Sequence, residues 1–88
     1  MKAKLESLIM EACEAHPAGK ARRRALDAIQ WVMKAKDGFY AGLTTGMQCA
    51  LLDNKTKASV FTGCDNHNLK LAFWQNAVGE DLEIEIIS

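Results

Sequence analysis

The C-terminal segment 82–87, Leu-Glu-Ile-Glu-Ile-Ile, alternates between apolar and acidic residues. Successive side chains of a strand point to opposite faces, so this pattern predicts a strand with one apolar face on a core. In the N-terminal segment 2–15, by contrast, apolar residues recur at steps of three and four, which predicts a helix. Because 88 residues suffice for one core, we expect a single α+β domain over 1–88.

A second helix is expected after the His-Pro-Ala-Gly break at 16–19. The residue before a proline is pushed out of helical geometry, and the glycine relaxes the turn. The second helix is predicted from about Arg22 to Lys36, with Gly38 as its stop, since glycine readily adopts the left-handed conformation that ends a helix. Its apolar stripe consists of Ala25, Leu26, Ile29, Val32 and Met33. The two helices are expected to form an antiparallel hairpin.

The middle of the chain predicts strands less clearly. Residues 39–46 fit either a short strand or a packed loop. Segments 47–52 and 58–62 are predicted to pair as a hairpin, with the polar residues 53–57 as their turn. A rival interpretation takes the Thr-x-x-Gln pattern that starts at Thr45 as a capping box, which would begin a short helix at Met47.

A third helix is predicted over 66–78, with Asp65 as its N-cap and Gly79 as its stop. A strand, a helix and a strand in series favour a right-handed crossover and a parallel pairing. The expected fold is therefore an N-terminal helical hairpin followed by a β-β-α-β unit, with a small mixed sheet of three to four strands and helices packed on it.

Trp31 stands out in the second predicted helix because it falls on the face opposite the apolar stripe. Helical winding places it on the polar face, with Lys20, Arg24, Asp27 and Lys34. An indole exposed among cations leaves a large apolar surface in water. We therefore expect a cover for Trp31, which could be another layer of the domain, a second subunit, a protein partner or a nucleic-acid base.

The third predicted helix is apolar over more than half of its circumference, and this includes Phe73 and Trp74. Such a helix is usually buried on more than one side, and a chain this short offers little material for that. Lys70 lies inside the apolar arc. We expect its methylene groups to pack while its ammonium reaches outward, for example to Glu83 or Glu85.

Charge and cysteine content narrow the classes of function. Eleven basic and eleven acidic side chains cancel, which argues against a strongly electrostatic, sequence-blind nucleic-acid binder and makes self-association easier. Three cysteines do not form a paired disulfide framework, and neither a signal peptide nor a membrane-spanning run is evident. A cytoplasmic protein that does not contact membranes is therefore expected.

Two Cys-x-x-His pairs are the sharpest chemical pattern, at Cys13/His16 and Cys64/His67. Together they would supply four ligands for tetrahedral zinc, but structural zinc sites more often use two cysteines in one tight turn. Cys64 could also act as a nucleophile near a helix N-terminus, although the neighbouring acid opposes its ionisation. The pattern is not sufficient for a catalytic signature, so we expect no enzyme, metal or cofactor.

The sequence instead favours a small non-enzymatic protein-interaction module, as a homodimer, an accessory subunit or an inhibitor-like binder. It would use the Trp31 face and the apolar third helix. The candidate partner-binding residues are Lys20, Arg22, Arg23, Arg24, Trp31, Lys34, Lys70 and Trp74. The alternative is nucleic-acid binding by the basic cluster 20–24, with Trp31 stacked on a base. A simpler explanation of that cluster is solvation, or ion pairing with Glu11 and Glu14.

Overall fold

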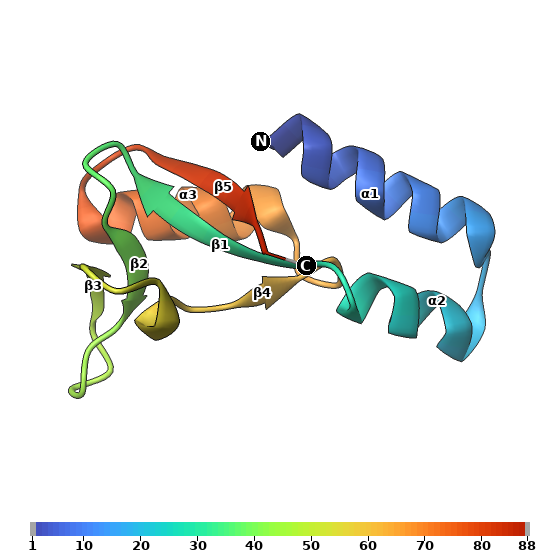
Figure 1. Cartoon of the computed structure of the whole chain (residues 1–88), viewed down its shortest axis with the longest axis horizontal. Helices are drawn as coiled ribbons and strands as arrows, with labels where there is room; N and C mark the ends of the chain where they lie inside the picture. The colour runs from blue at the N-terminus through green and yellow to red at the C-terminus, as the bar shows by residue number, and fades with distance from the viewer. Residues whose placement is uncertain (1, 88) are drawn as a thin grey trace.

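The computed structural model of the chain describes residues 2–87, so the two ends of the expected 1–88 domain lie outside the described residues. It confirms the α+β class, with a helical hairpin first, then strands and a final helix before the last strand (Figure 1). The elements are α1 (Lys2–Ala15), α2 (Gly19–Asp27), β1 (Gln30–Ala35), β2 (Tyr40–Leu43), β3 (Cys49–Leu52), the 3-10 turn η1 (Lys55–Lys57), β4 (Phe61–Thr62), α3 (His67–Val78) and β5 (Leu82–Ile86).

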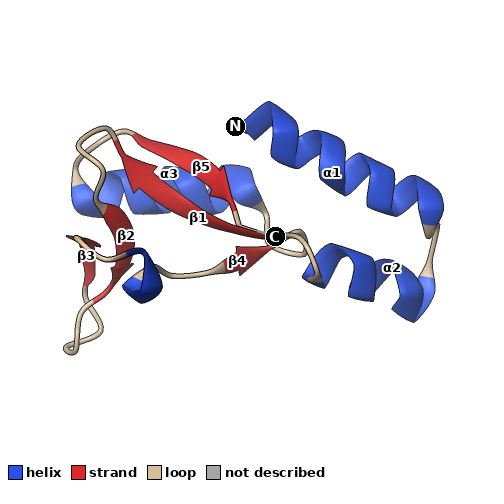
Figure 2. Ribbon diagram, in the orientation of Figure 1, coloured by secondary structure: helices blue, strands red, loops and turns tan. Residues whose placement is uncertain are grey.

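The sheet has five strands in antiparallel pairs, where three or four in a mixed sheet were expected, and β1 is at its centre (Figure 2). Trp31 pairs with both Phe61 and Ile86, while Lys34 pairs with both Tyr40 and Glu83. Hence β5 occupies one edge of β1, and β2 and β4 share the other. The predicted parallel pairing of the strands on either side of α3 does not form. β4 and β5 do run parallel to each other, but β1 lies between them and pairs with both.

The prediction that the second helix continues to Lys36 is wrong, because α2 ends at Asp27 and the chain then enters β1. No glycine marks this end. Instead, the distant backbone N–H of Gly63 donates to the carbonyl oxygens of both Leu26 and Ile29, each at 3.0 Å. A tertiary contact thus satisfies carbonyl groups that a longer helix would have paired internally.

Gly38 does not end a helix but forms the turn between β1 and β2. Its φ is +93°, and its N–H donates to the carbonyl of Ala35, while the Ala35 N–H donates to that of Phe39 at 2.8 Å. A left-handed glycine after Asp37 is the usual chemistry of a tight hairpin. The ambiguous segment 39–46 therefore contains a strand, β2.

The predicted hairpin of 47–52 with 58–62 is also wrong, because β3 pairs with β2 and β4 pairs with β1. Chain 53–60, with η1, passes instead close to Gly42, where an added Cβ would lie 2.6 Å from the Lys57 carbonyl oxygen. The short helix proposed at Met47 does not form. The hydroxyl of Thr44, rather than that of Thr45, accepts from the Gln48 N–H within the β2–β3 turn.

The predicted third helix is confirmed, with small changes at its N-terminus. Its N-cap is Asn66, whose side chain accepts from the N–H of Leu69, while Asp65 accepts from the N–H of Thr62 instead. Gly79 ends the helix in the left-handed conformation, as expected. No helix within residues 2–87 has the length and apolar character needed to cross a membrane.

The core lies between the sheet and the helices α1 and α3. Alternation along β1 directs Trp31, Met33 and Ala35 to this core, which also contains Leu5 of α1 and Trp74 of α3. In Figure 1, α1 and α2 extend beyond one end of the sheet. Helix α2 contains no fully buried residue; it packs Leu26 against the edge of the core and leaves its other side chains largely on the surface.

Candidate functional site

Trp31 is fully buried, so the sequence-based placement of this residue on a polar helix face is wrong. Its indole Nε1 donates to the carbonyl oxygen of Thr62 at 2.9 Å. Its ring stacks on Phe61, with centroids 4.8 Å apart and planes inclined by 29°. The cover expected for this indole is thus another layer of the same domain, and neither a partner nor a base can reach it.

Trp74, a second candidate residue, is also buried, and it continues the aromatic contacts outward. Phe61 meets it edge to face at 6.1 Å, and Phe73 also meets it edge to face, at 6.5 Å. Four rings from β1, β4 and α3 therefore form one connected series. The series begins at Trp31 in the core and ends at Phe73 on the surface.

The exposed apolar side chains of α3 form the most distinctive surface of the molecule. Leu69 is 68% exposed and Phe73 is 63% exposed, and the two lie one helical turn apart. They border a shallow hollow of about 360 Å³, together with Asn66, Lys70 and the edge of Trp74. We call these five residues the α3 surface. The sequence indicated that α3 carries more apolar area than one face can bury, and this excess is now located.

Lys70 lies on the α3 surface. The expected contact of its ammonium group with the acids of β5 does not form. Glu85 is instead paired with Lys55, whose Nζ lies 2.8 Å from a carboxylate oxygen. The Lys70 side chain is exposed beside the hollow. It therefore places a cation at the rim of an apolar site.

The basic cluster of α2 is exposed at all four positions: Lys20, Arg22, Arg23 and Arg24. Ion pairing with Glu11 and Glu14, one of the two simple explanations of this cluster, does not occur among the described residues. Within residues 2–87 the only ion pair in α2 joins Arg23 to Asp27 at 4.0 Å, and Arg22 donates to the carbonyl of Pro17 at 2.9 Å. The cluster is therefore a cationic surface with little internal neutralisation.

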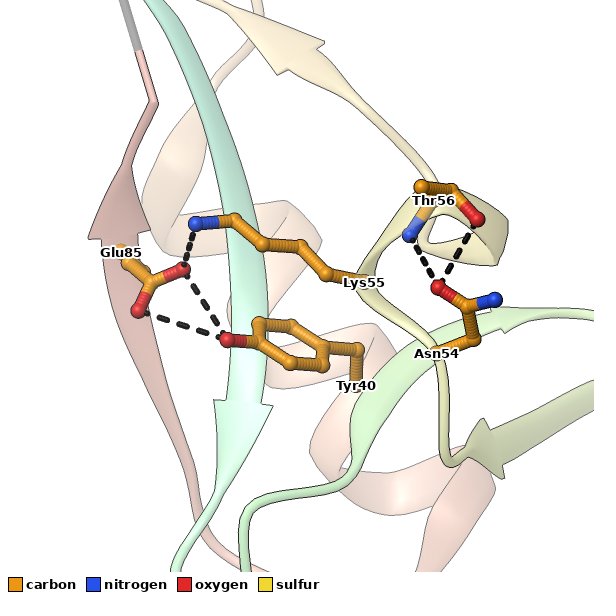
Figure 3. Close-up of polar contacts among 5 residues, drawn as sticks. All are labelled: Tyr40, Asn54, Lys55, Thr56 and Glu85. Carbon is orange, nitrogen blue, oxygen red and sulfur yellow. Dashed lines mark hydrogen bonds and ion pairs between the residues drawn. The ribbon is translucent and has the colours of Figure 1, made fainter.

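Lys34, the remaining candidate, lies on β1 and faces away from the core. It belongs to a polar group that the sequence did not reveal, because its members come from four separate elements. The Tyr40 hydroxyl donates to the Glu85 carboxylate at 3.2 Å, and the same carboxylate also pairs with Lys55 (Figure 3). The ammonium groups of Lys34 and Lys55 lie 5.9 and 6.0 Å from the centre of the Tyr40 ring.

Electrostatics within this group favour its charged forms. The hydrogen bond from Lys55, helped by the Lys55 charge, holds the pKa of Glu85 below its ordinary value, against the opposing effect of partial burial. The same contact raises the pKa of Lys55. Since both groups are ionised at neutral pH and paired with each other, this arrangement ties η1 and β2 to β5 rather than supplying a reactive residue.

The Cys-x-x-His pairs do not meet in the structure. Among residues 2–87 no three His, Cys, Asp or Glu side chains are grouped so that they could hold a metal ion. The His67 ring lies 3.2 Å from the Glu6 carboxylate instead. A hydrogen bond with Asp27 is the main cause of a raised pKa at Cys64, which disfavours the thiolate that a nucleophile needs.

No protein-family model, curated protein or solved structure matches this chain. A function must therefore be inferred from its own surfaces, of which the α3 surface and the basic face of α2 are the two most distinctive.

Proposed function

We propose that this protein is a non-enzymatic interaction module that pairs with a second copy of itself through the α3 surface. The observation that carries the proposal is the exposure of Leu69 and Phe73, one helical turn apart on the same face of α3, in a chain that buries both of its tryptophans. Large apolar side chains that a small domain leaves together on a helix commonly mark a binding surface. Three free thiols are consistent with a cytoplasmic location for such a module.

Phe73 is suited to be the central contact of an interface. Its ring rests edge to face on Trp74, which is itself fixed by Phe61 in the core. A side chain held in this way loses little conformational freedom on binding, so more of the free energy of apolar burial remains as affinity. Aromatic residues in such positions often dominate the binding energy of an interface.

A second copy is the occupant that the chemistry of the stripe favours. A two-fold axis across α3 would place Leu69 of one copy on Phe73 of the other, and the reverse, so that one patch serves both subunits. The zero net charge of the chain produces little repulsion between copies. The short stripe also limits the strength of the pair. Burial contributes about 1.5–3 kcal/mol per fully covered Leu or Phe side chain, against an association cost of at least about 4 kcal/mol.

The hairpin end between β2 and β3 offers a rival surface, with a hollow lined by Leu43, Leu52 and three polar residues. Its apolar side chains are less exposed than those of α3, because Leu43 is 41% exposed and Leu52 is partly buried. An interface there would therefore bury less new apolar area per side chain than one over Leu69 and Phe73. The α3 surface is therefore the better site.

Sedimentation equilibrium from micromolar to millimolar protein tests the proposal. We expect the average mass to rise above the 9.7 kDa of the monomer with increasing concentration. Leu69→Gln or Phe73→Gln should weaken the association at least tenfold. Met10→Gln is the matched control, because Met10 is a similarly exposed apolar residue on a different helix, at 62%.

Two results would overturn the proposal. One is a mass that stays at 9.7 kDa over the whole concentration range. The other is an association that Met10→Gln weakens as much as Phe73→Gln does. Circular dichroism of each variant checks that the fold is retained.

A further inference from the structure

Helix α2 gathers positive charge at one end of the molecule. It carries Lys20, Arg22, Arg23 and Arg24 against the single acid Asp27, a net charge of +3 over residues 19–27. Residues 80–85 contain four carboxylates and no cation, a net charge of −4. Figure 1 places α2 at one end of the molecule and the turn between α3 and β5 at the other. The zero total charge therefore combines a basic α2 with acidic residues elsewhere in the chain, and it does not describe the field near α2.

Helical geometry directs three of these cations the same way. At 100° per residue, Lys20, Arg23 and Arg24 fall within one arc of about 100°. Arg22 lies on the other side, where it donates to the carbonyl of Pro17. The arc is free of covering residues, since α2 has no buried side chain. Its only internal neutralisation is the 4.0 Å contact of Arg23 with Asp27, and both side chains are more than half exposed.

This arrangement is unfavourable for the isolated protein. Lys20 in the first turn of the helix opposes its dipole, although Arg24 in the last turn does not, and like charges in one arc repel each other. No packing contact offsets this cost, because these side chains lie on the surface. An anionic partner that spans several charges would relieve both effects at once.

We propose that α2 binds the phosphate backbone of double-stranded nucleic acid without reading its base sequence. A duplex presents one phosphate per about 1.7 Å of its axis, dense enough to engage a cationic arc on a nine-residue helix. Residues 19–27 of α2 contain no aromatic residue, and Trp31 is buried. The helix thus has no ring on which an unstacked base could lie, which favours a duplex over a single strand.

Fluorescence anisotropy with a labelled random-sequence DNA duplex tests the inference. Three engaged cations should give a slope of about −2.7 for the logarithm of the association constant against the logarithm of salt concentration. A fourfold rise in salt would then weaken binding roughly 40-fold. The triple variant Lys20→Gln, Arg23→Gln, Arg24→Gln should abolish measurable binding, and the salt dependence with it.

The control removes the same charge elsewhere, as Lys4→Gln, Lys36→Gln, Lys57→Gln, three exposed lysines outside α2. It should retain the binding and most of the salt slope of the unmodified chain. The inference is overturned if low-salt buffer shows no duplex binding, or if the control variant loses binding as fully as the α2 variant. It is also overturned if polyglutamate or single-stranded DNA competes better than unlabelled duplex, since either would identify another kind of partner.

Discussion

Gly63 is the residue that connects the helical hairpin to the sheet. Its N–H donates to the carbonyl of Leu26 in the last turn of α2 and to that of Ile29 just beyond the helix, and this requires a very close approach of the two backbones. A Cβ at Gly63 would lie 2.8 Å from the carbonyl oxygen of Leu26, a contact that backbone atoms cannot relieve by rotation. The end of α2 is thus fixed by a glycine that lies far away in the sequence.

Replacing this glycine should therefore destabilise the fold. We expect Gly63→Ala to lower the free energy of unfolding by about 1–3 kcal/mol, because the added methyl group forces the backbones apart. Gly46→Ala is the control, since the nearest atom to its added Cβ is a side-chain oxygen 3.8 Å away. Urea unfolding measures both. Equal stability of the two variants would contradict this role for Gly63.

Trp31 shows why single residues can mislead a sequence-based interpretation. The residues around it satisfy a helical stripe, yet Trp31, Met33 and Ala35 also recur at every second position, as one face of a strand requires. Short apolar segments often fit both periods. The strand is favoured over the helix by contacts of Trp31 with Phe61 and Thr62, which lie about thirty residues further along the chain.

At the scale of elements, the group formed by Tyr40, Lys55 and Glu85 fastens three segments on the sheet face opposite α3 (Figure 3). Glu85 has a lowered pKa, so its ionised form stabilises the fold at pH values above 4.5, the ordinary pKa of a glutamate. That contribution is lost as the pH falls through the lowered pKa. Lys55 has a raised pKa, so its contribution is lost only when the pH rises beyond 10.5.

A pH-dependent difference in stability should follow. We expect Glu85→Gln to be less stable than the unmodified chain at neutral pH, with a difference that disappears well below pH 4.5. The effect should be small and should shrink in high salt, because the Lys55 pair is partly exposed. Thermal unfolding across pH measures it, with Glu83→Gln as the control on the same strand. A difference that persists in acid would show that packing, rather than charge, is responsible.

Elements with strong local signals were predictable from the sequence. α1, α3 and β5 carry clear periodicity and, for α3, the glycine that ends it, and all three were predicted to within a few residues. β1 and the pairing of β2 with β3 were not, because their positions depend on long-range hydrogen bonds. The Asp37-Gly38 turn was the one local signal that could have revealed the first hairpin.

The candidate surfaces also divide into those that the sequence located and those that it did not. The apolar excess on α3 and the basic run on α2 are properties of single helices, so the sequence located both. Trp31 and the Tyr40 group depend on which strands lie side by side, and no local pattern contains that information. The sequence therefore indicated the exposed surfaces better than it indicated the core.

At the scale of the whole molecule, the two proposed surfaces belong to different helices and use different physics. The α3 surface is apolar and lies over the core, whereas the basic face of α2 extends beyond the sheet (Figure 1). Substitutions on one helix should therefore leave the binding by the other helix unchanged. The central claim is that Leu69 and Phe73 form a contact between two copies of the chain.

An isotope-filtered nuclear Overhauser experiment on a mixture of labelled and unlabelled chains tests that contact most directly. At millimolar protein we expect cross-peaks between the Leu69 methyl groups of one copy and the Phe73 ring of the other. These cross-peaks should vanish in Phe73→Gln. The account is contradicted if no intermolecular cross-peak appears at that concentration, or if those observed join residues outside the α3 surface.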